Sequence, residues 1–382
     1  MSVVTLEIAM PGMFTTLQDT GRYGHQRSGV PVSGAMDDFA LRAANLLVGN
    51  EESAAGLEMT VVGPQIKFSA ETAIAVTGAD LSATLHGETM PRWEAVAVPA
   101  GGVLEFGEMK DGMRAYLAVA GGLDVPVVMG SRSTYAKAGL GGLEGRPLAR
   151  GDSISTLPFR TGHEPVRKSL PEGYDPPTYG EHHRMRVVLG PHDEAFTPEA
   201  LEALLGSEYT VSLDSDRMGY RLEGPALKHR EGPDIVSDAN PSGAIQVPGD
   251  GMPTVLLADR GTTGGYAKIA TVIGVDVARL AQAVPGQTIA FQSVSVEEAH
   301  QALAEIEAVL KDIRDQPGTA LWPAPRIRVL VDGEPFEVTD EAGDVVSQTE
   351  DIGDAVRTRS RRALAMVEGK TFEFDVEVQR AT

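Results

Sequence analysis

The sequence predicts a mainly β protein with a few α-helices, built as two β-rich lobes and a small C-terminal α+β appendage. Glycine (43) and proline (24) are abundant, aromatic residues make up only 5%, and short apolar runs alternate with Gly, Pro and Asp. A length of 382 residues suits two or three domains. Stretches rich in Pro, Gly and charge at 158–183 and 316–325 divide the chain. We therefore expect lobes at 1–157 and 184–314 and an appendage at 326–382.

The first lobe is predicted to contain one helix among many short strands. An opening strand is expected at 3–8, followed by a polar, glycine-punctuated stretch at 11–25. From Met36 the apolar residues fall at helical spacing, which predicts a helix over 36–48 that ends at Gly49. The later strands have the spacing of a sandwich or barrel. They are expected at Leu57–Val62, Gln65–Ser69, Ala73–Thr77, Ser82–Leu85, Val96–Val98, Val103–Phe106 and Met113–Val119.

The second lobe alternates strands with capped helices. Thr197 is expected to cap a short helix whose first position is Pro198. Ser295 and Glu298 have the spacing of a capping box and open a longer packing helix. Strands are predicted at Met185–Leu189, Tyr209–Leu213 and Thr288–Phe291, and a helix from Asp276 to about Ala283.

The segment 237–268 carries the strongest local signal. It begins with a polar cluster at 237–241 that predicts a turn, and two apolar runs, 243–247 and 254–257, then predict a β-hairpin. The residues that follow, 259–266, contain two hydroxyls and two glycines. Glycines allow close backbone approach and leave N–H groups free to meet a carbonyl or anionic oxygen. A tight turn with a surface ion pair is an equal alternative.

Composition excludes several classes of function. A net charge of −21 disfavours nucleic acid as a partner. No run approaches the ~20 apolar residues of a membrane span, and the N-terminus has no signal-peptide pattern. The absence of cysteine removes disulfides and thiolate metal sites and fits a cytoplasmic protein. His163, His182 and His183 are expected to be solvated in the first linker, so no metal site is predicted.

Four motifs, taken together, carry a family resemblance. They are Gln18–Arg22 with Gly34–Asp37, Gly130–Thr134, Ser215–Leu222, and Gly243–Val247 with Thr262–Tyr266. Over roughly residues 3–310 the chain resembles the allophanate hydrolase subunit 2 / KipA family, which includes the C subunits of 5-oxoprolinases and is also called the biotin-dependent carboxyltransferase family. Gly261 and Ala267 depart from the usual family pattern, which has Gln and Pro there.

The resemblance implies cyclophilin-like barrel domains and a function within a complex. The first expectation is an ATP-dependent 5-oxoprolinase that opens 5-oxoproline to glutamate with KipI-like and LamB/YcsF-like partners, ATP being used by the complex. The alternative is the carboxyltransferase part of a urea or amide carboxylase, with carboxybiotin supplied by a partner. A non-enzymatic regulator that binds a KipI-like kinase inhibitor is a third possibility. A homo-oligomer of heterodimers is compatible with each. Biotin attachment at 326–382 is rejected, because no lysine there is flanked by methionines.

Both reactions act on a small amide or ureido substrate and place negative charge on oxygen, which calls for fixed hydrogen-bond donors. Arg217 and Arg260 are suited to bidentate donation, and Gln246 to an amide edge. Asp259 is expected to orient Arg260 rather than act as a base, because a carboxylate beside an arginine keeps a low pKa. The catalytic candidates are Asp259, Arg260, Thr263, Tyr266 and Lys268. The substrate-binding candidates are Gln246, Arg217, Thr262, Gly264, Gly265, Gln18, Asp19, Arg22 and Arg132.

Asp37 is a further polar candidate of the first lobe, and both it and Arg132 have a structural alternative of equal or greater weight. For Arg132, which lies between Ser131 and Ser133, a structural role in a turn and a contact with a ligand are equally expected. Asp37 lies in the first turn of the predicted helix, where a carboxylate favours the helix dipole without any ligand. No complete P-loop occurs, so an ATP site is expected to involve another subunit.

Overall fold

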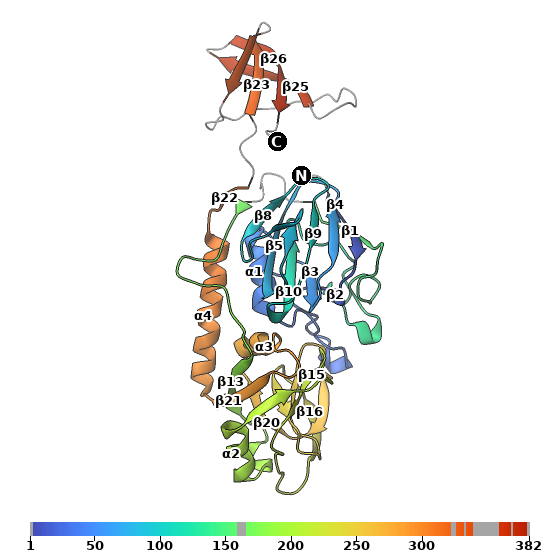
Figure 1. Ribbon diagram of the computed structural model, residues 1–382, viewed down its shortest axis with the longest axis vertical. Helices are drawn as coiled ribbons and strands as arrows, with labels where there is room; N and C mark the ends of the chain where they lie inside the picture. Colours follow the sequence, from blue (N-terminus) through green and yellow to red (C-terminus); the bar gives the residue numbers. More distant parts are fainter. Residues whose placement is uncertain are drawn as a thin grey trace. The chain divides into compact units, whose positions relative to one another are not determined.

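A computed structural model describes residues 3–158 and 166–321, together with the backbone of four strands between 326 and 379. Two compact units follow each other along the chain, Met1–Leu321 and Trp322–Thr382 (Figure 1). The first unit holds both β-rich lobes, each with its own hydrophobic core. His163 lies outside the described residues.

The N-terminal lobe is built from two antiparallel sheets that enclose its core. One sheet has the strand order β11-β1-β4-β9-β6-β7 and the other β2-β3-β10-β5-β8. Alternate residues of both sheets, such as Phe68 and Leu117, point into one apolar cluster. The strands are β1 (Thr5–Met10), β2 (Phe14–Gln18), β3 (Gly56–Thr60), β4 (Gln65–Phe68), β5 (Thr72–Asp80), β6 (Thr84–Leu85), β7 (Glu88–Thr89), β8 (Ala95–Val98), β9 (Val103–Glu105), β10 (Asp111–Val119) and β11 (Ser153–Ser155).

The predicted helix is confirmed as α1 (Asp38–Leu47), which packs against β5 and β10 (Figure 1). Asp37 is its N-cap and accepts a hydrogen bond from the Ala40 N–H. Strand β2 was not predicted, because its sequence is polar. Thr15 and Thr16 are nevertheless buried there, and β-branched threonine suits a strand whose polar atoms find partners.

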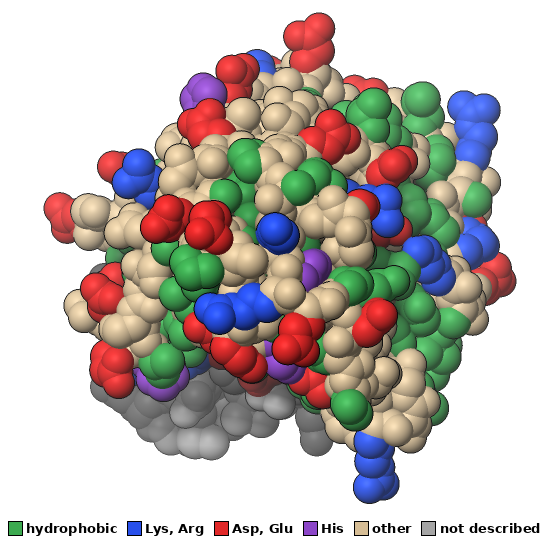
Figure 2. Space-filling view, turned by 90° about the horizontal axis from the view of Figure 1, so that it is seen from below, with side chains coloured by type: hydrophobic (Ala, Val, Ile, Leu, Met, Phe, Trp, Pro, Cys, Tyr) green, Lys and Arg blue, Asp and Glu red, His purple; other side chains and the backbone are tan. Residues whose placement is uncertain are grey.

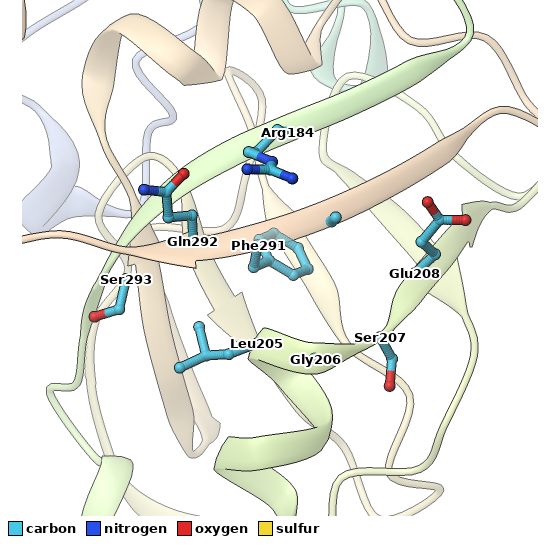
Figure 3. Close-up of a pocket in the computed structure, with 9 residues that line it drawn as sticks. Arg184, Leu205, Gly206, Ser207, Glu208, Phe291, Gln292 and Ser293 are labelled. Carbon is cyan, nitrogen blue, oxygen red and sulfur yellow. The ribbon is translucent and has the colours of Figure 1, made fainter.

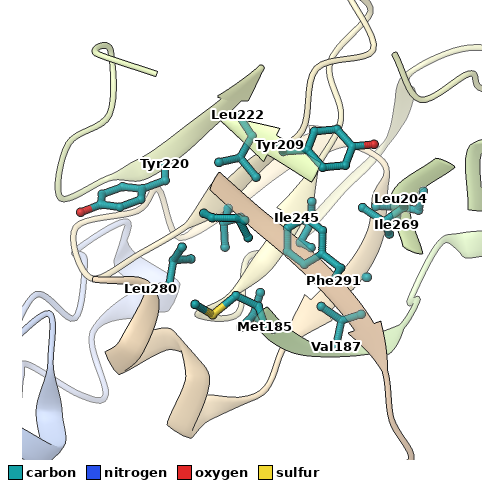
Figure 4. Packing of buried hydrophobic residues seen from close by; sticks show 14 of the residues in the cluster. Met185, Val187, Leu204, Tyr209, Tyr220, Leu222, Ile245, Ile269, Leu280 and Phe291 are labelled. Atoms are coloured by element: carbon teal, nitrogen blue, oxygen red, sulfur yellow. The ribbon is translucent and has the colours of Figure 1, made fainter. Parts of the chain in front are cut away.

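The second lobe is a closed seven-stranded barrel of order β13-β20-β17-β18-β15-β14-β21, which confirms the predicted barrel. Aliphatic and aromatic side chains fill its interior (Figure 4). The predicted hairpin is formed by β17 and β18, with Ile245 opposite Val255. The strands of this region are β12 (Val166–Arg167), β13 (His182–Leu189), β14 (Glu208–Val211), β15 (Gly219–Glu223), β16 (Asp234–Ala239), β17 (Ala244–Gln246), β18 (Thr254–Leu256), β19 (Thr263–Tyr266), β20 (Lys268–Val272), β21 (Thr288–Ser293) and β22 (Thr319–Ala320).

Two predictions in this lobe were wrong. His182 and His183 do not lie in the predicted linker but begin strand β13, which pairs in parallel with all of β21. His182 is exposed, as predicted. His183 is buried, with its Nε2 2.9 Å from Gln287 Oε1. The turn predicted over 237–241 begins only at Pro241, whose carbonyl accepts from the Ala244 N–H, because residues 237–239 belong to β16. Strand β16 pairs with β19 in a separate two-stranded sheet.

The capped helices are confirmed. Thr197 caps α2 (Pro198–Gly206), and Ser295 and Glu298 form the capping box of α4 (Val296–Asp315). The remaining helices are α3 (Gly274–Leu280) and the 3-10 helices η1 (Gln26–Ser28), η2 (Ala136–Ala138) and η3 (Asp193–Ala195). No helix within the described residues is long and apolar enough to cross a membrane.

The second unit contains a four-stranded antiparallel sheet of order β24-β23-β26-β25. The helix of the predicted α+β appendage has no counterpart among the described residues of this unit. Its strands are β23 (Arg326–Val331), β24 (Glu334–Val338), β25 (Arg359–Val367) and β26 (Lys370–Gln379).

Candidate functional site

A buried arginine joins the two lobes of the first unit. Arg217 donates from Nε to Asp259 Oδ2 (2.9 Å), from Nη2 to the Gly34 carbonyl (2.7 Å), and from Nη1 to the Glu58 carboxylate. Burial works to lower the pKa of Arg217, but Glu58 and Asp259 outweigh it and raise the pKa. The sequence predicted that Asp259 would orient its chain neighbour Arg260. This prediction was wrong, because Asp259 pairs with Arg217 instead. All three Arg217 nitrogens are occupied by protein acceptors.

Glu58 was missed by the sequence analysis, although it is central to this contact. Its side chain is 1% exposed and accepts further hydrogen bonds from the Tyr116 hydroxyl and the Met36 N–H, both 2.8 Å long. Burial and the charge of Glu58 raise the pKa of Tyr116 well above its usual range. A glutamate between Leu57 and Met59 in an apolar strand was the signal that could have found it.

A second polar contact crosses between the lobes at Gln282. Its Nε2 donates to Asp37 Oδ2 (2.7 Å) and its Oε1 accepts from the Arg114 N–H (2.8 Å). The Tyr220 hydroxyl points away from the barrel core (Figure 4) and accepts a hydrogen bond from the Arg114 guanidinium. Burial raises the pKa of Asp37 to about 6, against the opposing effect of its hydrogen bonds from Gln282 and Ala40. Asp37 is thus both a helix cap and an interlobe contact.

Within the N-terminal lobe, the loop that contains Asp19 is hydrogen-bonded to the loop that contains Arg132. Asp19 accepts from the Ser131 hydroxyl (2.7 Å) and from the Arg132 N–H (2.6 Å). The Arg132 side chain lies 3.6 Å from the Asp124 carboxylate. Asp19 and Arg132 therefore shape the loop pair by internal bonds.

Arg22 and Gln18 are buried in the same loop pair and keep unpaired polar atoms. Arg22 donates to the carbonyls of Val128 (2.9 Å) and Ser133 (2.8 Å), and Gln18 Nε2 donates to Thr134 O (3.1 Å). Arg22 Nη1 and Gln18 Oε1 have no hydrogen-bond partner among the described residues. Burial lowers the pKa of Arg22, and the nearby Asp19 and Asp259 carboxylates oppose that effect.

The amide side chains of Gln246 and Asn240 lie next to Gly264 of strand β19. Gln246 Nε2 donates to Asn240 Oδ1 (3.1 Å), and Asn240 Nδ2 donates to Gly261 O (3.0 Å). A Cβ on Gly264 would lie 2.4 Å from Gln246 Nε2, so a larger residue there would displace the Gln246–Asn240 amide pair. At Gly265 a Cβ would meet nothing nearer than Ser237 Oγ at 3.5 Å.

Lys268 is fully buried on β20, next to this amide pair. Its Nζ donates to Asp238 Oδ1, and its backbone N–H donates to His192 Nδ1 (3.3 Å). His192 Nε2 lies 3.5 Å from Asp238 Oδ2. Lys268 was predicted from the sequence, but neither of its partners was. Asp238 was assigned to a turn, and His192 is an isolated histidine without a motif.

Arg260 is half-buried at the strand exit and keeps a free donor. It donates from Nε to Asn240 O (2.8 Å) and from Nη1 to Leu257 O (3.1 Å). This leaves Nη2 without a hydrogen-bond partner among the described residues. Burial lowers the pKa of Arg260, and Tyr23 of the N-terminal lobe opposes that effect. Of the remaining candidates, Thr262 is half-buried and Thr263 and Tyr266 are exposed.

Two surface cavities lie elsewhere on the barrel lobe. One, of about 390 Å³, opens where α2 ends and is bordered by Leu205, Glu208 and Phe291 (Figure 3). The other, of about 480 Å³, is lined by Glu194, Arg230 and other residues up to Ile235. Neither is lined by a residue selected from the sequence. The described residues contain no group of three or more His, Asp or Glu side chains able to hold a metal ion.

The face of the protein in Figure 2 carries mixed charge. Acidic and basic side chains are interspersed over its coloured residues, and hydrophobic side chains gather in small groups.

Comparison with known proteins identifies the family. Residues 28–293 match the carboxyltransferase domain, subdomain A and B. The chain is 41% identical to the C subunit of 5-oxoprolinase from Escherichia coli over 302 residues, which cover 78% of this chain and 94% of that protein. It is 34% identical to urea amidolyase of Saccharomyces cerevisiae, covering 85% of this chain but 18% of the yeast protein.

The fold agrees with that assignment. The crystal structure of the K. lactis urea amidolyase matches 94% of this chain with a TM-score of 0.77 and 31% identity, and this chain covers 22% of that protein. The chain therefore belongs to the family of the carboxyltransferase domain, subdomain A and B.

Proposed function

We propose that this chain is a subunit of an ATP-dependent 5-oxoprolinase-type hydrolase, which opens 5-oxoproline to glutamate in the cytoplasm together with KipI-like and LamB/YcsF-like partners. One observation carries the proposal. The match to the C subunit of the E. coli 5-oxoprolinase extends over 94% of that protein, whereas the match to yeast urea amidolyase covers 18% of it. The match thus spans nearly all of the 5-oxoprolinase subunit but only a small part of the amidolyase.

The chemistry of the site suits this role. Opening a cyclic amide places negative charge on the carbonyl oxygen, and fixed donors in a partly dry site stabilise that charge. We assign this role to the Nη2 of Arg260, which is half-buried, and to the hydroxyls of the neighbouring Thr262 and Thr263. Arg217 and Asp259 then act by holding the two lobes together immediately beside Arg260.

ATP is assigned to a partner subunit. No complete P-loop motif occurs in this chain, and no residue of it is assigned to the nucleotide. The role of this chain in the proposed reaction is to bind the amide and to stabilise charge on its oxygen. The isolated chain is accordingly expected to be inactive, since half of the pocket would come from the partner.

The second candidate is the carboxyltransferase part of a biotin-dependent urea or amide carboxylase. The second unit favours it. Residues 1–321 are 84% of the chain (321 of 382), and the match to the K. lactis urea amidolyase covers 94%. That match therefore extends into the second unit, whereas the match to the E. coli 5-oxoprolinase subunit covers only 78% of the chain. In this reaction, carboxybiotin would be supplied by a partner protein.

Reconstitution separates the two candidates. The chain is co-purified with its KipI-like and LamB/YcsF-like partners, and glutamate release from 5-oxoproline is followed with and without ATP. We expect turnover that requires ATP and all three proteins. Turnover with carboxybiotin and a urea or amide, but none with 5-oxoproline, would favour the carboxylase instead. Stable capture of the KipI-like protein without either activity would favour a regulatory protein.

A further inference from the structure

The buried position of Lys268 separates it from any substrate. Its side chain is 0% exposed, whereas the side chain of its partner Asp238 is 42% exposed. An ammonium group that is sealed from solvent cannot contact a small molecule from outside. Whatever Lys268 contributes must therefore be transmitted through the Asp238 carboxylate.

Strand pairing brings the surrounding polar groups to one face. Asp238 is directly opposite Gly264 in the β16–β19 ladder, and Gln246 is opposite Lys268 in the β17–β20 ladder. Side chains of directly opposed residues in an antiparallel pair project to the same face. The Cβ direction of Gly264 points at Gln246 and Asn240. The carboxylate of Asp238 consequently lies beside the two amides beneath β19.

Two side chains, those of Lys268 and His192, contact the Asp238 carboxylate and keep it oriented as a hydrogen-bond acceptor. The Lys268 ammonium occupies Oδ1, and His192 Nε2 lies 3.5 Å from Oδ2. Because His192 Nδ1 accepts the Lys268 N–H, the neutral imidazole carries its proton on Nε2, which faces Asp238. A carboxylate has about four lone-pair positions, so acceptor capacity remains on its exposed side.

We propose that Asp238 binds the substrate's amide nitrogen by accepting its N–H hydrogen bond, and that Lys268 and His192 are positioning residues for Asp238. The inference rests on the proposed function, because it names the part of an amide or ureido substrate that this site distinguishes. The donors of Arg260 and its neighbours bind the carbonyl oxygen, and Asp238 binds the N–H group. A compound that has the carbonyl but lacks the N–H leaves the carboxylate unpaired and binds more weakly.

Calorimetry on the assembled complex tests the inference without turnover. The ligands are 5-oxoproline and N-methyl-5-oxoproline, which differ only at the amide nitrogen. The wild-type complex is expected to prefer 5-oxoproline about tenfold or more. Asp238→Asn is expected to bring the preference close to one. Asp234→Asn, an exposed carboxylate on the same strand, is the matched control and should keep the wild-type preference.

The positioning role of Lys268 is tested by the same measurement, the ratio of the affinities for 5-oxoproline and N-methyl-5-oxoproline. Lys268→Met is expected to weaken the preference, and adding it to Asp238→Asn should cause no further loss, because both act through one carboxylate. A purely structural role for Lys268 would weaken both ligands equally and leave the ratio unchanged. The inference is overturned if the wild type binds neither ligand, shows no preference, or keeps it in Asp238→Asn. Turnover of 5-oxoproline is measured in parallel, so that the proposed function and this inference can fail separately.

Discussion

Arg217 on the barrel lobe and Glu58 on strand β3 form a buried ion pair that links the two lobes of the first unit. Their side chains are 9% and 1% exposed, and Asp259 holds the other side of the guanidinium. An ion pair removed from water is weak support for stability in itself, but breaking it leaves an uncompensated buried charge. This contact and the Gln282–Asp37 hydrogen bond together hold the two lobes, and hence Arg260, in position.

Removal of the shared arginine should therefore destabilise the protein strongly. Arg217→Met leaves two carboxylates buried without their cation and is expected to cost about 3–5 kcal/mol in the free energy of unfolding. Glu58→Gln should cost less, because Asp259 still pairs with Arg217. Urea denaturation of the purified chain measures both. Arg146→Met, which removes two ion pairs of a partly exposed arginine, is the control and should cost much less than Arg217→Met. Equal, small losses in all three variants would show that the interlobe pair is unimportant.

Asp37 should make stability depend on pH between about 4 and 6. Its pKa rises from 3.8 to about 6 on folding, so the folded protein binds more protons than the unfolded chain in that interval. Its contribution to stability therefore falls as pH rises and is lowest above pH 6. A pKa rise of this size corresponds to about 3 kcal/mol.

Asp37→Asn isolates that contribution, because asparagine keeps the cap without the charge. Thermal or urea unfolding of both proteins from pH 4 to 7 gives the comparison. The wild type should lose stability relative to the variant as pH rises. Parallel stability profiles would contradict the assigned burial of the Asp37 carboxylate.

Gly264 and Gly265 should differ sharply in their tolerance of alanine. A Cβ at Gly264 would lie 2.4 Å from Gln246 Nε2 and 2.9 Å from Asn240 Nδ2, so the amide pair must shift. Overpacking of this kind costs about 1–3 kcal/mol. Gly264→Ala should therefore lower both stability and activity, whereas Gly265→Ala should change neither appreciably. Urea unfolding and turnover are measured for both variants. Equal stability and equal turnover of the two would contradict the close approach of β19 to Gln246.

The sequence was sufficient for features that depend on local pattern. The stripe from Met36 predicted α1, Ser295 and Glu298 predicted the cap of α4, and the apolar runs around Ile245 predicted the barrel hairpin. Each signal lies within a few residues of the element it specifies. Strand β2 could not be predicted from the sequence, because its buried threonines resemble loop residues unless their hydrogen-bond partners are known.

The site could be predicted only in part, because its pairings are long-range. Sequence proximity suggested that Asp259 orients Arg260, but Asp259 instead pairs with Arg217, 42 residues away. Lys268 was selected from its motif, whereas Asp238 is recognisable only once β16 is paired with β19. Glu58 contacts a residue 159 positions further along the chain. Partners this distant leave no local pattern.

The central claim is that the segment after the hairpin supplies donors to the carbonyl oxygen of a small amide. Its most direct test is the double variant Arg260→Ala/Thr263→Ala in the fully assembled complex, assayed for ATP-dependent glutamate release from 5-oxoproline. Loss of even one such donor typically lowers kcat by about 10²–10³. We predict at least that loss, with the three proteins still co-purifying and the variant chain still folded. Unchanged turnover in the double variant would contradict the account.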